Sequence, residues 1–413
     1  MYTLDCWRRT AIFDEPKDSA PITIAAPARF DFIGGWTDTP PYFFDNVSGV
    51  LNATLDLVGG PGNTYRAGAR CNAPLLSFPE AAITITVRSS ERFAVTENGL
   101  PLSDVSRHMV IAKTLEFLSI GVPDVCRTHV GVPFTSPKVS ISITNSIPHG
   151  SGLGGSSLLT ASLLGALMAF YLGIDYLREH MTDLVNNVLY IEQMMGSGGG
   201  WQDQIGGLFP GVKLIETNPE EPCSYSIDYL DRGIELLNER SLVIDTRVQR
   251  KAARILASIR QKYIDRDPRT VRMLAAIARN AQIGFHLLAE FDIRSFAELL
   301  SDSWRMVNEV ESGSIEAVEC LRTLFRDDLI GMKIGGAGGG GFILAIFSDR
   351  DRKEYHRRSV RNEYPECIVY DPVFGGEGMA VYPGEAGDAS LKLPYRVAGM
   401  RALRCAVHGG SRL

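Results

Sequence analysis

Apolar and polar residues alternate in the middle of the chain, just before a long apolar stretch. Val139, Ile141 and Ile143 are separated by serine residues, and this period of two is typical of a half-buried strand. Residues 157–174 are almost continuously apolar, which at this length favours a helix buried in the core over a membrane span. We therefore expect a strand, a glycine-rich loop and a core helix in this order.

The same patterns predict further elements along the chain. Strands are expected at residues 21–33 with a break at Pro27, at 50–57, at 83–87 and on both sides of a second glycine loop in 332–347. Helices are expected at residues 109–118, 182–195, 248–264, 270–289, 293–308 and 314–325. Thr182 is the expected N-cap of its helix. Residues 201–217 indicate a turn followed by a strand.

Both halves of the chain mix strands and helices, which predicts an α+β fold. The pattern changes near residue 216, where a domain boundary is expected. The predicted domains cover residues 1–215 and 216–385, and a terminal extension rich in Gly, Ala and Arg follows at 386–413. Residues 59–80 are rich in Gly, Pro, Asn and Ala and are expected to form a loop.

Composition narrows the class of protein. The 413 residues carry 42 Lys and Arg against 48 Asp and Glu, and this net charge of −6 argues against a nucleic-acid-binding protein. The seven cysteines are scattered and form no CxxC pair, so reduced thiols in a cytoplasmic protein are expected. The sequence does not begin with the apolar core of a signal peptide.

The glycine loop at residues 147–157, IPHGSGLGGSS, is suited to bind phosphate. Glycine lets backbone N–H groups approach an anion closely, and the following helix N-terminus adds the positive end of its dipole. A Walker A loop is excluded because no GK[ST] follows. The spacing of Gly150, Gly152 and Gly155, with Asp175 20 residues further on, also matches a dinucleotide-binding fingerprint. A dinucleotide site and a purely structural turn both stay open on this loop alone.

Three motifs in order resemble those of a known family. PARFDFIGGWTD at 27–38, IPHGSGLGGSS at 147–157 and KIGGAGGGGF at 333–342 resemble the motifs of the GHMP kinases, the superfamily of galactokinase, homoserine kinase, mevalonate kinase and phosphomevalonate kinase. GGWTDTPPY at 34–42 and GGGWQDQIGGLFPGVK at 198–213 look like the branch that phosphorylates L-fucose. They look, less closely, like the kinases of D-glycero-D-manno-heptose 7-phosphate.

This resemblance implies a two-domain α+β fold. Its N-terminal domain would contain a left-handed βαβ unit, an exception to the usual right hand, and its C-terminal domain would be ferredoxin-like with added helices. Fucokinases often occur fused to a nucleotidyltransferase, whereas the length of this chain resembles that of the free kinase module.

The resemblance also assigns the groups for phosphoryl transfer. Asp203 is the expected catalytic base, and Arg29 is expected to place a fixed positive charge near the transferred group. Glu192 is expected to bind Mg²⁺ together with Ser156, with Ser157 as the second choice, although these serines are also suited to cap the helix. The ATP-binding loop is expected to comprise Pro148, Gly150, Ser151, Gly152, Leu153, Gly154, Gly155, Ser156 and Ser157.

The acceptor site is less well specified. Asp38 matches the aspartate that binds sugar hydroxyls in galactokinase-like relatives, but Gly35 and Trp36 stand where galactokinases have Glu-His. Trp36 and Trp201 either face the sugar ring or belong to the core. The second glycine loop is expected to approach the substrate, the nucleotide phosphate or the first loop. Candidate substrate residues are therefore Asp38, Trp36, Trp201, Gly338 and Gly339.

These features predict an ATP- and Mg²⁺-dependent kinase that phosphorylates the anomeric hydroxyl of a sugar, with L-fucose as the first choice. The alternatives are a kinase of heptose 7-phosphate, an NAD(P)-binding oxidoreductase and a kinase-derived sugar sensor without catalysis. The expected partners are a small sugar and ATP, with no nucleic acid and no membrane. A homodimer stays open.

Overall fold

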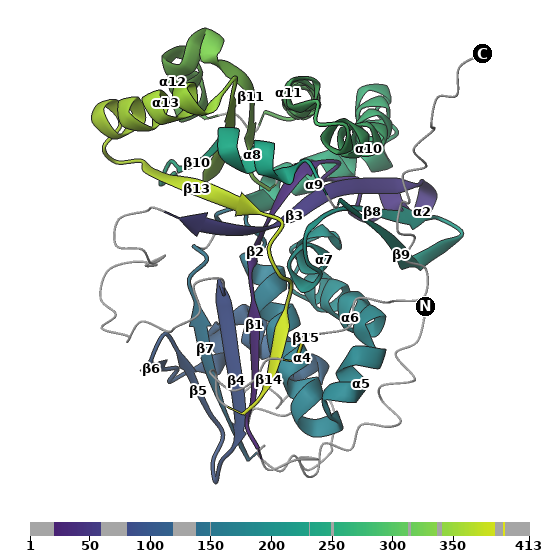
Figure 1. Cartoon of the computed structure of the whole chain (residues 1–413). Helices are drawn as coiled ribbons and strands as arrows, with labels where there is room; N and C mark the ends of the chain where they lie inside the picture. The colour runs from purple at the N-terminus through teal and green to yellow at the C-terminus, as the bar shows by residue number, and fades with distance from the viewer. Residues whose placement is uncertain are drawn as a thin grey trace, which may run out of the picture.

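Two β-sheets with helices packed against them organise the chain (Figure 1). The computed structural model describes residues 20–58, 81–118, 138–148, 150–230, 232–248, 252–312, 315–336, 341–384 and 391–392. The expected loop at 59–80, most of the extension at 386–413, and the candidate residues Gly338 and Gly339 lie outside the described residues.

The first sheet, in the lower half of Figure 1, holds the strand that precedes the glycine loop. It has seven strands in the order β15-β14-β1-β4-β7-β5-β6. Strand β7 keeps the predicted alternation, because Val139, Ile141 and Ile143 are buried. The strands are β1 (Ile22–Ala26), β4 (Ile83–Ser89), β5 (Ala94–Glu97), β6 (Leu100–Pro101), β7 (Val139–Asn145), β14 (Ala380–Pro383) and β15 (Leu391–Lys392).

Helix α4 (Gly155–Leu172) is the centre of this half and packs on β1 and β4. Its residues are apolar on all sides, as in a helix surrounded by protein. Among the described residues it alone has the length and hydropathy of a membrane span, and 83% of it is buried. The predicted core helix is therefore confirmed. Its neighbours are α3 (Met109–Phe117), α5 (Ile174–Glu179), α6 (Met181–Met194) and α7 (Gln202–Leu208), and the 3₁₀ turn η1 (Val105–Arg107) lies against α3.

The second sheet crosses the molecule above the first and combines strands from both halves of the sequence (Figure 1). Seven of its eight strands follow the order β11-β12-β10-β13-β3-β8-β9, and the eighth, β2, pairs with β3. The strands are β2 (Ala28–Ile33), β3 (Ser48–Val58), β8 (Val212–Asn218), β9 (Glu221–Leu230), β10 (Ser241–Asp245), β11 (Leu329–Ile334), β12 (Phe342–Phe347) and β13 (Ile368–Phe374).

The later strands of this sheet have the ferredoxin-like arrangement. Along the chain β10 is followed by helices, then by β11, β12, α13 and β13, and in space the order is β11-β12-β10-β13. This is the βαββαβ order with extra helices in the first crossover, so the predicted fold class is confirmed. The remaining helices are α2 (Tyr42–Asp45), α8 (Ile234–Arg240), α9 (Ala252–Ile264), α10 (Pro268–Ala289), α11 (Ile293–Val310), α12 (Glu316–Phe325), the 3₁₀ turn η2 (Arg326–Asp328) and α13 (Arg350–Glu363).

Two local predictions were wrong. Helix α6 begins at Met181 without a side-chain cap, so Thr182 lies inside the helix. The predicted turn after Trp201 is the helix α7, although it contains Gly206 and Gly207. A Cβ at either glycine would collide with Asn52 or Leu158, so close packing outweighs the low helix propensity of glycine. The domain boundary near residue 216 stays a prediction, and residue 216 lies inside β8.

Candidate active site

The glycine loop leads into α4 and leaves the N-terminus of this helix open. Gly150, Gly152 and Gly154 have φ values of 74°, 77° and 81°, a region that favours glycine. Gly154 is the N-cap residue, and no side chain caps the helix. The capping role left open for Ser156 and Ser157 is therefore not observed. The first N–H groups of a helix have no partner within it, which makes this end of α4 suited to an anion.

The second glycine loop packs directly on the first. A Cβ at Gly152 would lie 2.5 Å from the carbonyl oxygen of Gly335, and one at Gly336 would lie 2.7 Å from the Cα of Gly152. A Cβ at Gly341 would lie 2.7 Å from the carbonyl oxygen of Ser151. The sequence left open whether the second loop approaches the substrate, the nucleotide phosphate or the first loop. Its described residues contact the first loop.

A dinucleotide fold does not surround the loop. The sheet neighbours of β7 are β4 and β5, which both precede it in the chain. A dinucleotide-binding unit instead continues from the helix into a further parallel strand. Asp175, the residue for the ribose in that alternative, has a side chain that is 88% exposed and pairs with Arg178 at 2.9 Å.

Arg29 and Asp203 meet beside the glycine loop. Arg29, in β2, is only 2% exposed; its Nη2 donates to Oδ1 of Asp203, and its Nη1 donates to the carbonyl oxygen of Gly152 at 2.8 Å. Asp203 lies in the first turn of α7, and its side chain is 28% exposed. Burial raises the pKa of the Asp203 carboxyl, and the charge of Arg29 opposes that rise. The two candidate catalytic residues thus form one ion pair at the loop.

Glu192 lies in α6 and turns a buried carboxylate toward this pair. Its Oε2 accepts a hydrogen bond from Ser197 at 2.9 Å, whereas its Oε1 is buried without a hydrogen-bond partner among the described residues. Burial and the charge of Asp203 raise the pKa of Glu192, while Ser197, Ser157 and Ser156 lower it. An orphaned carboxylate oxygen beside serine hydroxyls fits the hard oxygen ligands that Mg²⁺ prefers.

No group of three or more His, Cys, Asp or Glu side chains in the described ranges is arranged as a metal site. A cation bound by Glu192 would therefore rely on hydroxyl groups, waters and substrate phosphates for its other ligands, which is how Mg²⁺ is usually held in phosphoryl-transfer sites.

Asp38 is completely buried and joins two segments of the site. Its Oδ1 accepts from the backbone N–H of Trp36 at 3.1 Å, and its Oδ2 accepts from the backbone N–H of Gln202 at 3.0 Å. Gln202 begins α7, so Asp38 holds the N-terminus of the helix that carries Asp203. Burial raises the pKa of Asp38 to about 7. A Cβ at Gly200 would lie 2.1 Å from the Asp38 carboxylate, which explains that glycine.

The two candidate tryptophans are mostly buried. Trp36 is 7% exposed and packs with Tyr42, Tyr263 and other apolar residues, while Trp201 is 3% exposed in the main core. Trp36 also lines a small hollow described below. Of the two alternatives for these tryptophans, the packing therefore favours a place in the core over contact with a sugar ring.

A second buried ion pair was missed by the sequence interpretation. Lys333, at the end of β11, donates to Oδ2 of Asp31 at 2.7 Å, to the carbonyl oxygen of Asp31 at 2.8 Å and to that of Phe32 at 2.9 Å. The only signal in the sequence was a charged residue inside each of two apolar runs, ARFDFI and MKIGG. The charge of Asp31 contributes to the raised pKa values of Asp38 and Asp203, which places this pair at the site.

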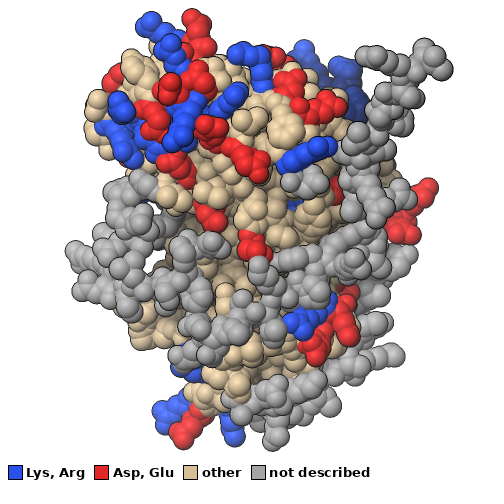
Figure 2. Space-filling model, viewed as in Figure 1, with Lys and Arg blue, Asp and Glu red and all other residues tan. Residues whose placement is uncertain are grey.

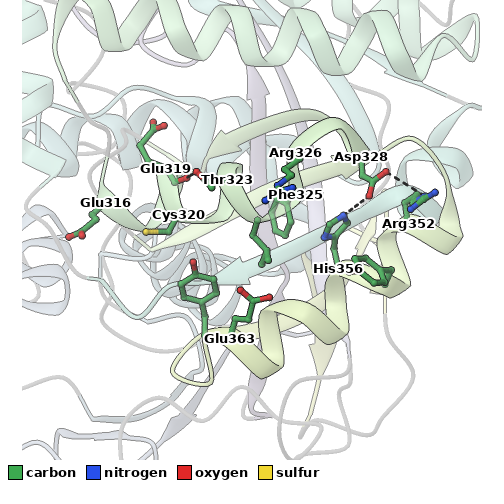
Figure 3. Close-up of a pocket in the computed structure, with 13 residues that line it drawn as sticks. Glu316, Glu319, Cys320, Thr323, Phe325, Arg326, Asp328, Arg352, His356 and Glu363 are labelled. Atoms are coloured by element: carbon green, nitrogen blue, oxygen red, sulfur yellow. Dashed lines mark hydrogen bonds and ion pairs between the residues drawn. The ribbon is translucent and has the colours of Figure 1, made fainter.

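A larger hollow lies elsewhere, between α12 and α13, with a volume of about 760 Å³ (Figure 3). None of the candidate site residues lines it. His356 and Arg352 of α13 pair there with Asp328 of η2 at 2.8 and 3.4 Å. Acidic and basic side chains are mixed over this end of the molecule, without a basic patch on the face shown in Figure 2. These ion pairs hold α13 to the sheet end and offer no phosphoryl-transfer chemistry.

Family models match both halves of the chain. The model described as GHMP kinases N terminal domain matches residues 118–211, and the one described as GHMP kinases C terminal matches residues 285–366. The galactokinase of Lactococcus lactis, solved with galactose, superposes with a TM-score of 0.58 over 90% of this chain and 95% of its own, at 15% identity. At this identity the likeness concerns the fold alone.

Curated relatives share more sequence. The chain is 29% identical to the bifunctional fucokinase/GDP-fucose pyrophosphorylase of Arabidopsis thaliana and 28% identical to the L-fucokinase/L-fucose-1-P guanylyltransferase of Bacteroides fragilis, over 84% and 78% of its length. It covers 32% and 34% of those proteins, about a third of each. It is 26% identical to the D-glycero-alpha-D-manno-heptose 7-phosphate kinase of Campylobacter jejuni, over 60% of this chain and 72% of that one.

Proposed function

We propose that the chain is a GHMP kinase that transfers the γ-phosphoryl group of ATP to the anomeric hydroxyl of a sugar, with L-fucose as the first choice. The observation that carries this proposal is the convergence of Asp203, Arg29 and Glu192 on the open end of α4. A base, a fixed cation and an orphaned carboxylate at a phosphate-binding helix end are the parts that phosphoryl transfer needs.

The triphosphate would lie against the glycine loop. Backbone N–H groups of residues 150–157 and the dipole of α4 favour its negative charge. Because the second loop touches Gly152, it keeps the first loop in its phosphate-binding shape. Arg29 is anchored to the carbonyl of Gly152, so its charge would lie near the γ-phosphoryl group of an ATP bound to this loop.

Mg²⁺ would be held by Glu192 and by Ser156, whose hydroxyl contributes to lowering the pKa of the Glu192 carboxyl. When bound there, the cation neutralises charge on the phosphates. Glu192 is 4% exposed and its Oε1 has no protein partner in the described part of the chain, so a ligand role also satisfies an otherwise costly buried oxygen.

Asp203 would receive the proton of the anomeric hydroxyl. As that oxygen attacks the γ-phosphorus, the bond between this phosphorus and the bridging oxygen of ADP breaks, and the proton passes to the carboxylate. Burial raises the basicity of Asp203, while Arg29 keeps the carboxylate ionised and oriented. A base positioned in this way typically contributes about 10²- to 10⁴-fold in rate.

The relatives support a sugar as the acceptor, and two of the three named above carry fucokinase in their names. The heptose 7-phosphate kinase of Campylobacter jejuni supplies the competing acceptor. An ADP-release assay with L-fucose, D-galactose, D-mannose and D-glycero-D-manno-heptose 7-phosphate separates the two. We expect L-fucose to have the highest kcat/KM. A preference for the heptose phosphate would overturn the choice of sugar, and no sugar-dependent ADP release would favour a sensor without catalysis.

A further inference from the structure

The Asp31–Lys333 pair has one oxygen without a partner. Asp31 is 1% exposed. Its Oδ2 is bound by Lys333, but its Oδ1 is buried and makes no hydrogen bond to any described residue. An ionised oxygen left unpaired inside a protein costs free energy. A ligand that donates a hydrogen bond to Oδ1 would remove this cost.

Asp31 lines a small hollow near the predicted base, whose pKa its charge helps to raise. Asp31, Gly35, Trp36 and Lys333 line it, together with residues of α11 such as Val307 and with Glu311, which follows this helix. It offers about 20 Å³ to water-sized groups, which is room for one hydroxyl group or one water molecule. The hollow is therefore too small for a whole sugar ring and matches a single ring substituent.

Gly35 connects the hollow to α7. A Cβ on Gly35 would lie 2.4 Å from Oδ2 of Asp31 and 3.2 Å from Oε1 of Gln202. Gln202 directly precedes Asp203, and its Oε1 is a second buried acceptor without a partner among the described residues. Glycine at position 35 thus leaves space between the Asp31 carboxylate and the unpaired Oε1 of Gln202, next to the predicted base.

The Asp31–Lys333 ion pair lies where the pairing of β2 with β3 is irregular. The register shifts between Asp31 and Ile33, as in a β-bulge, which frees backbone groups and redirects a side chain. The carbonyl oxygens of Asp31 and Phe32 turn to Lys333 instead. All three N–H donors of the ammonium are consequently in use.

The charges favour an uncharged ligand group. Of the described residues that line the hollow, Lys333 is the one cation, and it has no donor to spare. A phosphate entering here would meet the Asp31 carboxylate, and Lys333 has no hydrogen-bond donor left to bind it. A neutral hydroxyl group, in contrast, can donate a hydrogen bond to Oδ1 without bringing a second negative charge into the hollow.

We infer that Asp31, held by Lys333, accepts a hydrogen bond from one ring hydroxyl of the acceptor sugar and so determines which neutral sugar is phosphorylated. This inference rests on the proposed sugar-kinase function. Asp31 is then a specificity-determining residue, and Lys333 is the positioning residue that holds the carboxylate through Oδ2 and leaves Oδ1 without a protein partner among the described residues.

The test compares deoxy sugars in two enzymes. The kcat/KM values of L-fucose, 2-deoxy-, 3-deoxy- and 4-deoxy-L-fucose are measured for the wild-type chain and for Asp31→Asn. In the variant, the amide oxygen would face Lys333 and the NH₂ group would face the hollow, so the acceptor is lost. A hydrogen bond to a charged group corresponds to roughly 10- to 100-fold in rate.

We expect one deoxy sugar to lose roughly 10- to 100-fold against L-fucose in the wild-type chain and to lose little in Asp31→Asn. The control is Asp371→Asn, which removes a carboxylate from another buried lysine, Lys353, at 2.8 Å in the C-terminal half. It should leave the ratios between sugars unchanged, even if it lowers stability.

Equal losses for every deoxy sugar in both enzymes contradict the inference alone, as expected if the hollow holds a structural water. A wild-type chain that phosphorylates none of these sugars contradicts the proposed function, and the inference falls with it.

Discussion

Asp203 and Arg29 show how one ion pair can serve both orientation and charge. Arg29 fixes the carboxylate from one side and the glycine loop, through Gly152, from the other. The proposed base and the glycine loop are therefore placed relative to each other by a single guanidinium group, whose planar fork suits such double contacts.

Replacing Asp203 by Asn should lower kcat by about 10²- to 10⁴-fold, because the amide cannot take a proton. ATP affinity, measured by calorimetry without sugar, should change little. Asp175→Asn is the matched control, since its carboxylate is exposed and pairs only with Arg178 among the contacts described here, and it should retain full activity. An Asp203→Asn enzyme with wild-type turnover would exclude this base.

Asp38 should make stability depend on pH. Its folded-state pKa of about 7 lies above the usual value of about 4. Between these values the folded state holds a proton that the unfolded chain has released, so stability decreases as pH rises from 4 to 7. The Asp38→Asn variant lacks this term. In urea unfolding, the unfolding free energy of the variant relative to that of the wild type should rise by a few kcal/mol (on the order of 4 at most) from pH 4 to pH 7.

The amide in Asp38→Asn also loses one acceptor for a backbone N–H, so the variant starts from a lower stability at acidic pH. The pH dependence of the difference is what matters. If the difference in unfolding free energy between the two proteins stays constant from pH 4 to pH 8, the pKa of Asp38 in the folded state is not raised.

At the scale of elements, the two glycine loops act as one unit. The first loop needs glycine for two separate reasons, positive φ angles and the nearby backbone of the second loop. These reasons can be separated by experiment, because other glycines in the chain meet only the first requirement.

Gly152→Ala should impair the enzyme far more than Gly99→Ala. Both residues have φ near +80°, so both variants bear a conformational cost of about 1 kcal/mol. Gly99 has open space around its Cβ position, whereas Gly152 would collide with Gly335. We expect Gly152→Ala to raise the KM for ATP by more than about tenfold, a shift of 1.4 kcal/mol. Equal thermal stability and equal KM in the two variants would argue against interlocked loops.

The elements that the sequence predicts well are those with strong local patterns. The alternation in β7, the apolar run of α4 and the periodic helices α10 and α11 were all readable. Helix α7 was not, because its glycines suggest a turn and only the contacts with Asn52 and Leu158 explain them. The Asp31–Lys333 pair was missed for a similar reason, since 302 residues separate its partners.

At the scale of the whole molecule, the end of the described chain returns to the beginning. After β13 in the second sheet, β14 joins the first sheet beside β1, with Val381 opposite Ile24. In Figure 1 this is the yellow strand beside the purple one. Such pairing between distant segments cannot be deduced from local patterns, and residues 380–383 were not predicted as a strand.

This return should be essential for stability. Val381→Asp places a charge at a position that is 0% exposed between β1 and the core, and we expect a loss of more than about 4 kcal/mol, typical of a buried unpaired charge. Val373→Asp is the control in the preceding strand, where the side chain is 42% exposed, and it should cost about 0.5 kcal/mol or less. Similar midpoints of urea unfolding would mean that β14 contributes little.

The site itself was predicted in part. The resemblance supplied Asp203, Arg29, Glu192 and the first loop, and the structure brings these groups together, although their catalytic roles are still proposals. The sequence could not indicate that Asp38 is engaged by backbone N–H groups on both oxygens, because this depends on the packing of two loops that are 164 residues apart.

The central claim is tested most directly by the chemical identity of the product. The wild-type chain is incubated with ATP, Mg²⁺ and L-fucose, and the product is examined by ¹H–³¹P correlated NMR. The account predicts one new phosphorus signal coupled to the anomeric proton of the sugar, with one ADP formed for each phosphorylated sugar. Phosphate on another carbon, or ATP hydrolysed without any phosphorylated sugar, would contradict it.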